Sequence, residues 1–116
     1  MTSRITFRAA AAAAAFTILA TGSAGAQELV LGTTLPFAGP FAPYGETVRD
    51  GYQLAVEQIN AKGGVTVGGK AHKLKLVVLD NQGDPNQVAA QGRKLIQSEK
   101  AVALLGSMTP MFNVPI

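Results

Sequence analysis

The stretch from residue 28 to residue 64, ELVLGTTLPFAGPFAPYGETVRDGYQLAVEQINAKGG, decides the fold because its hydrophobic pattern changes twice. The run over 28–34 is short and mostly apolar, which is typical of a strand buried on both faces of a sheet. The run over 35–45 is rich in Pro, Gly and aromatic residues and predicts a loop. Over 46–62 apolar residues recur at helical spacing, at Val48, Tyr52, Ala55 and Ile59. This pattern predicts a strand, a loop and a helix, and Gly63-Gly64 ends the helix.

Residues 65–106 repeat the alternation of strand and helix. The segment 65–73 predicts a small hairpin that turns at Gly68-Gly69, and 73–80, KLKLVVLD, predicts a second long strand. Asp84 and Pro85 are typical of a helix start, with Asp84 as N-cap and Gln87 as the return partner of a capping box. This helix is expected to run to about residue 100, and the residues expected to face inward are Val88, Gly92, Leu95 and Ile96. The run 101–106, AVALLG, predicts a third strand.

This order of elements favours an α/β fold with a doubly wound, mostly parallel sheet and right-handed crossovers, as in a flavodoxin-like lobe. The first three strands of such a sheet commonly lie in the order 2-1-3, and ligands bind at the carboxyl ends of strands one and three. The loop 35–45 and the loop 107–110 are therefore expected to face each other. Three strands leave an unprotected edge, so we interpret residues 27–116 as the N-terminal part of lobe one of a longer protein.

The first 26 residues are typical of a secretory signal peptide. Arg4 and Arg8 precede an apolar block of about a dozen residues, and the segment ends in the small residues Ala24-Gly25-Ala26. A membrane-spanning helix needs about 20 apolar residues, so this block is too short to span. Cleavage is expected after Ala26, which makes Gln27 the first mature residue and the periplasm the expected location.

Charge and cysteine content exclude several classes of function. The chain carries ten Lys and Arg against seven Asp and Glu; loss of Arg4 and Arg8 with the signal peptide leaves eight against seven, a net charge of +1. No basic stripe with interleaved aromatic residues remains, which argues against nucleic-acid binding. The sequence has no cysteine, so neither a disulfide framework nor a lipid anchor on an N-terminal cysteine is expected.

No motif in the sequence predicts catalysis, a metal site or a bound cofactor. His72 is the only histidine and has no cysteine nearby, so we interpret it as an exposed turn residue. Ser107 lies outside a G-x-S-x-G elbow, and Gly32 begins neither a dinucleotide fingerprint nor a Walker motif. Asp80 ends a strand, where it is expected to secure the following loop. An enzyme on a flavodoxin-like scaffold is therefore the weakest of the functional hypotheses.

Three side chains are candidates for holding a small ligand. Ser107 and Thr109 offer hydroxyl groups where a helix is expected to begin, and backbone N–H groups there favour a carboxylate. Tyr44 offers an aromatic face and a hydroxyl from the opposite loop. The alternative interpretation is that Tyr44 packs its loop and that Ser107 and Thr109 only cap the helix.

Several motifs, taken in order, give the chain a family resemblance. They are Gly39-Pro40, Tyr44-Gly45, the run 59–64 (INAKGG), Asp84-Pro85 before a helix, and 104–106 (LLG) before a hydroxyl-rich loop. Together they resemble the leucine/isoleucine/valine-binding protein family, the type I periplasmic solute-binding proteins of ABC transporters. The resemblance covers essentially all of residues 27–116.

This resemblance implies a two-lobed protein, monomeric at full length, that closes on its ligand by a hinge and delivers it to an ABC transporter permease. It implies that Tyr44 lines the site and that the loop after the third strand contributes a serine, or its backbone, to a ligand carboxylate. Pro110 departs from the family by standing where a hydroxyl residue is common. It puts that contact in doubt, so either Thr109 or Ser107 takes the role or the ligand differs, since relatives also bind aromatic acids, amides and urea. A ligand-sensing domain of a receptor or regulator with the same fold remains a second hypothesis.

Overall fold

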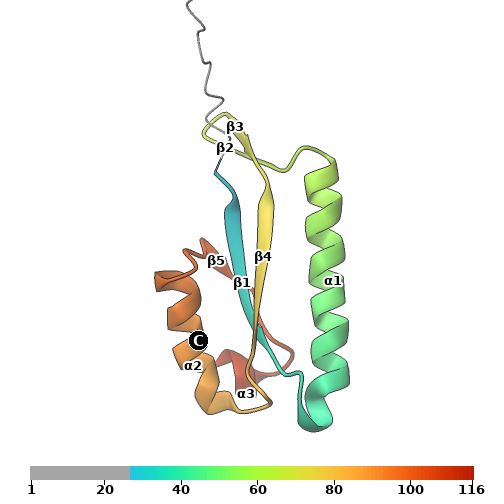
Figure 1. Ribbon diagram of the computed structural model, residues 1–116, viewed down its shortest axis with the longest axis vertical. Coiled ribbons are helices and arrows are strands. Elements are labelled where there is room, and N and C mark those ends of the chain that lie inside the picture. Colours follow the sequence, from blue (N-terminus) through green and yellow to red (C-terminus); the bar gives the residue numbers. More distant parts are fainter. Residues whose placement is uncertain (1–26) are drawn as a thin grey trace, which may run out of the picture.

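A three-stranded sheet lies between one long helix on one side and two shorter helices on the other (Figure 1). The computed structural model describes residues 27–116, and the predicted signal peptide lies outside the described residues. The elements run β1 (Leu29–Leu35), η1 (Gly39–Phe41), α1 (Ala42–Ala61), β2 (Val65–Val67), β3 (Lys70–His72), β4 (Leu74–Asp80), α2 (Pro85–Gln97), β5 (Ala103–Leu104) and α3 (Pro110–Asn113). Within this range no helix is long and apolar enough to cross a membrane.

The main sheet has the order β4-β1-β5 with all strands parallel, which confirms the predicted 2-1-3 order. β1 and β4 pair over their full length, from Leu29 opposite Leu74 to Leu35 opposite Asp80. β5 pairs over two residues only, so the predicted third strand of 101–106 is too long. β2 and β3 form the predicted antiparallel hairpin at the other end of the molecule from α3 (Figure 1).

The core lies between the sheet and its helices and is small. Its fully buried apolar side chains include Leu35 of β1, Val88 and Leu95 of α2 and Phe112 of α3. Val88, Gly92 and Leu95 face inward as predicted, whereas the prediction for Ile96 is wrong because its side chain is 53% exposed. Ile96 follows Leu95 by one residue, and the roughly 100° turn per helical residue carries it off the face that meets the sheet.

Helix α1 begins at Ala42, four residues before its predicted start, and η1 precedes it, so the loop predicted over 35–45 ends sooner. Pro40 and Pro43 caused this error, because each stands in the first turn of its helix. The N–H groups there have no intrahelical partner, so proline is tolerated. Ala55 and Ile59, which were predicted to share the inward face of this helix with Val48 and Tyr52, are exposed.

The termini of α1 and α2 follow local rules with one exception. Gly63 and Gly64 have φ angles of 108° and 90° and end α1 as predicted. Asp84 caps α2 by accepting from Asn86 N at 2.8 Å. The predicted capping box is wrong, because Asp84 N donates to Asn81 O at 2.8 Å and leaves no role for Gln87.

Candidate functional site

The carboxyl ends of β1 and β5 lead into two segments that lie against each other. Phe41 of η1 and Phe112 of α3 meet edge to face, with ring centroids 5.7 Å apart and an interplanar angle of 89°. This geometry is favourable for aromatic pairs, and Phe112 is fully buried. The expectation that the segments after the first and third main strands face each other is confirmed.

Asp80, at the end of β4, secures the segment that follows β1. Its carboxylate accepts from Phe37 N at 3.0 Å and from Gln82 N at 2.7 Å, as the sequence predicted for this residue. Gln91 of α2 links the ends of β1 and β4. Its Nε2 donates to Asp80 O at 2.7 Å, and its Oε1 accepts from Thr34 Oγ1 at 2.5 Å. The path of the chain out of β1 is therefore set by side chains from β4 and α2.

Tyr44 stands in the first turn of α1 rather than in a loop, and its side chain is 61% exposed. The next residue, Gly45, is buried, and a Cβ atom built on it would lie 1.8 Å from Pro36 O. The first turn of α1 therefore rests directly on the backbone that leaves β1. This close approach fixes where Tyr44 is displayed.

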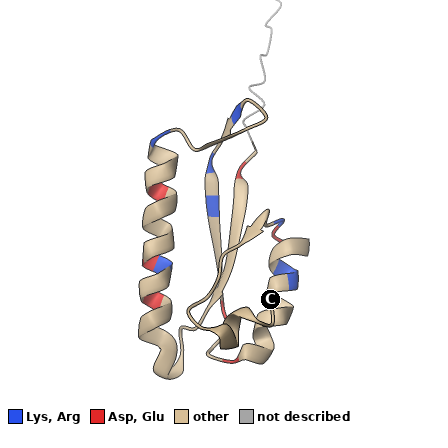
Figure 2. Ribbon diagram, turned by 180° about the vertical axis from the view of Figure 1, so that it is seen from behind, with Lys and Arg blue, Asp and Glu red and all other residues tan. Residues whose placement is uncertain are grey.

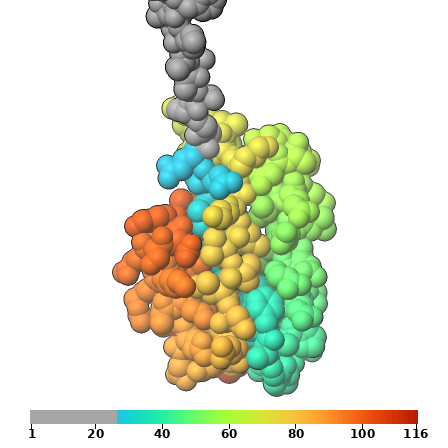
Figure 3. All heavy atoms as spheres, viewed as in Figure 1, coloured from blue at the N-terminus to red at the C-terminus, as the bar shows by residue number. Residues whose placement is uncertain are grey.

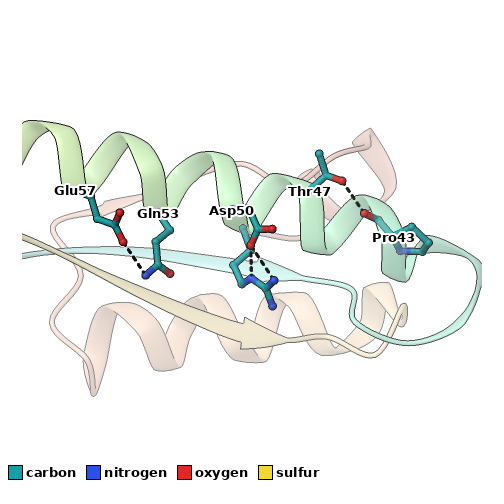
Figure 4. Close-up of polar contacts among 6 residues, drawn as sticks. Pro43, Thr47, Asp50, Gln53 and Glu57 are labelled. Atoms are coloured by element: carbon teal, nitrogen blue, oxygen red, sulfur yellow. Dashed lines mark hydrogen bonds and ion pairs between the residues drawn. The ribbon is translucent and has the colours of Figure 1, made fainter.

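The side chains beyond Tyr44 on α1 make local contacts. Thr47 Oγ1 donates to Pro43 O at 2.9 Å, and Gln53 Nε2 donates to Glu57 Oε1 at 3.2 Å (Figure 4). Arg49 forms an ion pair with Asp50 at 2.8 Å and lies 5.5 Å from the centroid of the Phe37 ring. The Arg49 guanidinium is thus already paired with a carboxylate on its own helix.

Ser107 and Thr109 lie in the segment between β5 and α3. Thr109 is the N-cap residue of α3 but its side chain makes no capping hydrogen bond. Ser107 Oγ and Thr109 Oγ1 are both buried and find no hydrogen-bond partner within residues 27–116. Buried hydroxyl groups are normally paired, so these two are exceptions within residues 27–116, as are Thr33 Oγ1 and Asn81 Nδ2.

Two residues that sequence reasoning missed hold this segment. Tyr52 Oη donates to Gly106 O at 2.6 Å, and Asn113 Oδ1 accepts from Ser107 N at 2.6 Å. Because Ser107 N–H is already bonded and α3 has only four residues, the prediction that backbone N–H groups at a helix start hold a carboxylate lacks support here. The helical period marked Tyr52 as inward-facing, but no sequence signal connects its hydroxyl with a loop 54 residues later.

The candidate residues do not form a closed site within residues 27–116. Residues 27–116 enclose no pocket, and no hydrogen bond within them joins Tyr44 to Ser107 or Thr109. Lys and Arg are scattered over the hairpin, β4, α1 and α2 without forming a patch (Figure 2). His72 lies on β3, in the hairpin at the other end of the molecule from α3 (Figure 1), and its Nδ1 donates to Gln27 O at 2.7 Å.

The arrangement of sheet, helices and facing segments is that of an incomplete lobe of a type I periplasmic binding protein. Residues 28–111 match the family described as "Periplasmic binding protein", and the chain belongs to this family. It is 36% identical over 92 residues to "Leu/Ile/Val-binding protein homolog 7" of Brucella melitensis, an alignment covering 79% of this chain and 22% of the relative. It is 33% identical over 88 residues to "Amino acid binding protein" of Pseudomonas aeruginosa, covering 76% of this chain and 22% of the relative.

Solved structures agree with this assignment. The substrate binding protein LivJ of a branched-chain amino acid transporter from Streptococcus pneumoniae, in complex with isoleucine, matches with a TM-score of 0.67 and 28% identity over 76% of this chain. A solute binding protein of an ABC transporter from R. palustris, in complex with benzoate, matches with a TM-score of 0.59 and 32% identity over 76% of this chain. The chain spans only 24% and 23% of these two proteins, so most of each has no counterpart in it.

Proposed function

We propose that this chain forms one wall of the ligand site of a periplasmic solute-binding protein that serves an ABC importer. The ligand is an amino acid or a related small carboxylate or amide, bound by hinge closure between this lobe and a second lobe. The second wall is supplied by the part that the relatives have and this chain lacks. The mature protein starts at Gln27, is monomeric and delivers its ligand to a permease.

The observation that carries the proposal is the pair of hydroxyl groups of Ser107 and Thr109, which follow β5 and are buried without a partner among residues 27–116. In open α/β sheets ligands bind at this end, where the strand order reverses. The two solved relatives were crystallised with isoleucine and with benzoate, which differ in their apolar parts but share a carboxylate. A carboxylate accepts hydrogen bonds only, and two hydroxyl donors match that need.

Pro110 limits how the carboxylate is held. It opens α3 and has no N–H to donate, so the contact passes to the hydroxyl groups before it. Catalysis by the described residues has no support, because Ser107 precedes α3 whereas His72 is on β3, in the hairpin at the other end of the molecule from α3 (Figure 1), and the two form no nucleophile–base pair.

A ligand screen with the full-length protein tests the proposal. Amino acids, aromatic acids, amides and urea are added one at a time, and the midpoint of thermal unfolding is measured. A bound ligand stabilises the folded state by mass action, so we expect at least one of these solutes to raise the midpoint. If none does, the proposal is wrong.

The site assignment is tested with the same ligand by calorimetry. Ser107→Ala and Thr109→Val each remove one hydroxyl donor to a charged group, so we expect roughly a 10- to 100-fold loss of affinity. Ser98→Ala is the matched control, because Ser98 is exposed at the far end of α2. Unchanged affinity in both hydroxyl variants contradicts the assignment. Measurable binding by residues 27–116 alone would contradict the proposal that a second lobe supplies the other wall.

A further inference from the structure

The peptide group between Gly106 and Ser107 is bound at both of its polar atoms by side chains. Its carbonyl oxygen accepts from Tyr52 Oη at 2.6 Å, and its N–H donates to Asn113 Oδ1 at 2.6 Å. Tyr52 comes from α1 and Asn113 from α3, so two separate helices hold one peptide plane.

The sheet explains why these two side chains are needed. The last hydrogen bond between β1 and the β5 segment runs from Leu105 N to Gly32 O at 2.7 Å, and the chain then leaves the ladder. Backbone groups that leave a ladder bond instead to side chains or to water. Tyr52 and Asn113 replace the missing strand at this point, and Asn113 Nδ2 also reaches Ser107 O at 3.3 Å.

This arrangement also determines which atoms of the segment are free. Asn113 occupies the N–H and the carbonyl of Ser107, so the backbone of Ser107 is fully used. The hydroxyl groups of Ser107 and Thr109 are left buried and without a partner in the described part of the chain. Fixing the peptide plane from both sides restricts the backbone from which the Ser107 side chain extends, and a segment that is already ordered loses less conformational entropy when a ligand arrives.

We propose that Tyr52 is a positioning residue for ligand binding. Its hydroxyl holds the Gly106 carbonyl, with Asn113 on the other side of the same peptide, so that the hydroxyl groups rather than the N–H of Ser107 meet the ligand. This inference rests on the proposed function, because it concerns the same segment.

The test compares Tyr52→Phe with Thr47→Val in the protein as its gene encodes it. Both substitutions delete one hydroxyl group from α1, but Thr47 Oγ1 bonds only to Pro43 O of the same helix. Three quantities are measured: the exchange rate of the Ser107 amide and the carbonyl chemical shift of Gly106 without ligand, and the dissociation constant for the ligand found in the screen. We expect Tyr52→Phe to speed the exchange, move the shift and weaken binding about five-fold, as the loss of one hydrogen bond implies. Thr47→Val should leave all three unchanged.

Each other result has a defined meaning. If Tyr52→Phe lowers the unfolding midpoint but leaves the exchange, the shift and the affinity as in the parent protein, Tyr52 only stabilises the fold and the inference is overturned. If the parent protein binds no solute, the proposed function fails, while the exchange rate and shift still decide whether Tyr52 holds the segment. If Tyr52→Phe does not fold, Asn113→Ala frees the same peptide group from its other side, and an unchanged Ser107 exchange rate in that variant overturns the inference.

Discussion

The contact between the first turn of α1 and the end of β1 makes Gly45 sensitive to any added side chain. Gly45→Ala would place a methyl carbon 1.8 Å from Pro36 O and 2.8 Å from Pro36 C, both backbone atoms that cannot rotate away. Helix α1 must therefore move off the sheet by an ångström or more, which also shifts Tyr44. The comparison variant is Gly51→Ala, since Gly51 lies in the same helix and a Cβ there meets nothing within 4 Å.

The two substitutions have opposite expected signs. Alanine is preferred over glycine in a helix interior by about 1 kcal/mol, and Gly51→Ala should gain roughly that amount. Gly45→Ala has the same intrinsic preference, but overpacking against backbone costs about 3 kcal/mol or more. We therefore expect a net loss of about 2 kcal/mol for Gly45→Ala and a gap of about 3 kcal/mol between the two variants.

Urea unfolding followed by circular dichroism measures both free energies of unfolding, provided that the slopes remain equal. Equal stability of the two variants would refute the reasoning, because it would mean that α1 does not rest on Pro36. In the ligand assay, Gly45→Ala should also weaken binding, whereas Gly51→Ala should bind as the parent protein does.

Two further predictions concern side chains that hold backbone groups. Asp80→Ala removes the acceptor for Phe37 N and Gln82 N. We therefore expect the free energy of unfolding to fall by about 1 to 2 kcal/mol and hydrogen exchange to become faster at those two amides. Normal protection of both amides would contradict the role of Asp80. Asn60→Ala removes two hydrogen bonds, from Leu74 N to Asn60 Oδ1 and from Asn60 Nδ2 to Leu74 O, both at 2.8 Å. Urea unfolding should therefore show a loss of about 2 kcal/mol in the free energy of unfolding. Gln58→Ala on the same helix is the control.

The parts of the fold that the sequence predicts are those set by local rules. The period of apolar residues located both long helices, and the alternation of strands and helices predicted the parallel order of the sheet. Asp84 as N-cap and the turn at Gly68-Gly69 also follow from local chemistry, and both are confirmed. The misplaced start of α1 has a local cause too, since proline reads as a helix breaker unless its place in the first turn is known.

The candidate site was less predictable because its geometry depends on distant contacts. Ser107 and Thr109 could be selected by type and by their place after the third strand. The backbone of their segment is held by Tyr52 and Asn113, which come from two helices. The early end of β5 has the same origin. The carbonyl and N–H groups between Gly106 and Ser107 form hydrogen bonds with side chains instead of with β1. Only the folded chain brings these groups together.

Asn60 has a consequence for self-association as well as for stability. β4 is an edge strand, and its atoms remain visible between α1 and α2 (Figure 3). Leu29 N donates to Lys73 O, so the polar groups of Leu74, the next residue, point to the outer edge. Open edges with apolar side chains pair readily with other chains, and Asn60 occupies this edge with a side-chain amide as a strand from another molecule would. Together with the exposed charge of Lys75, it protects β4 from the intermolecular pairing that begins aggregation.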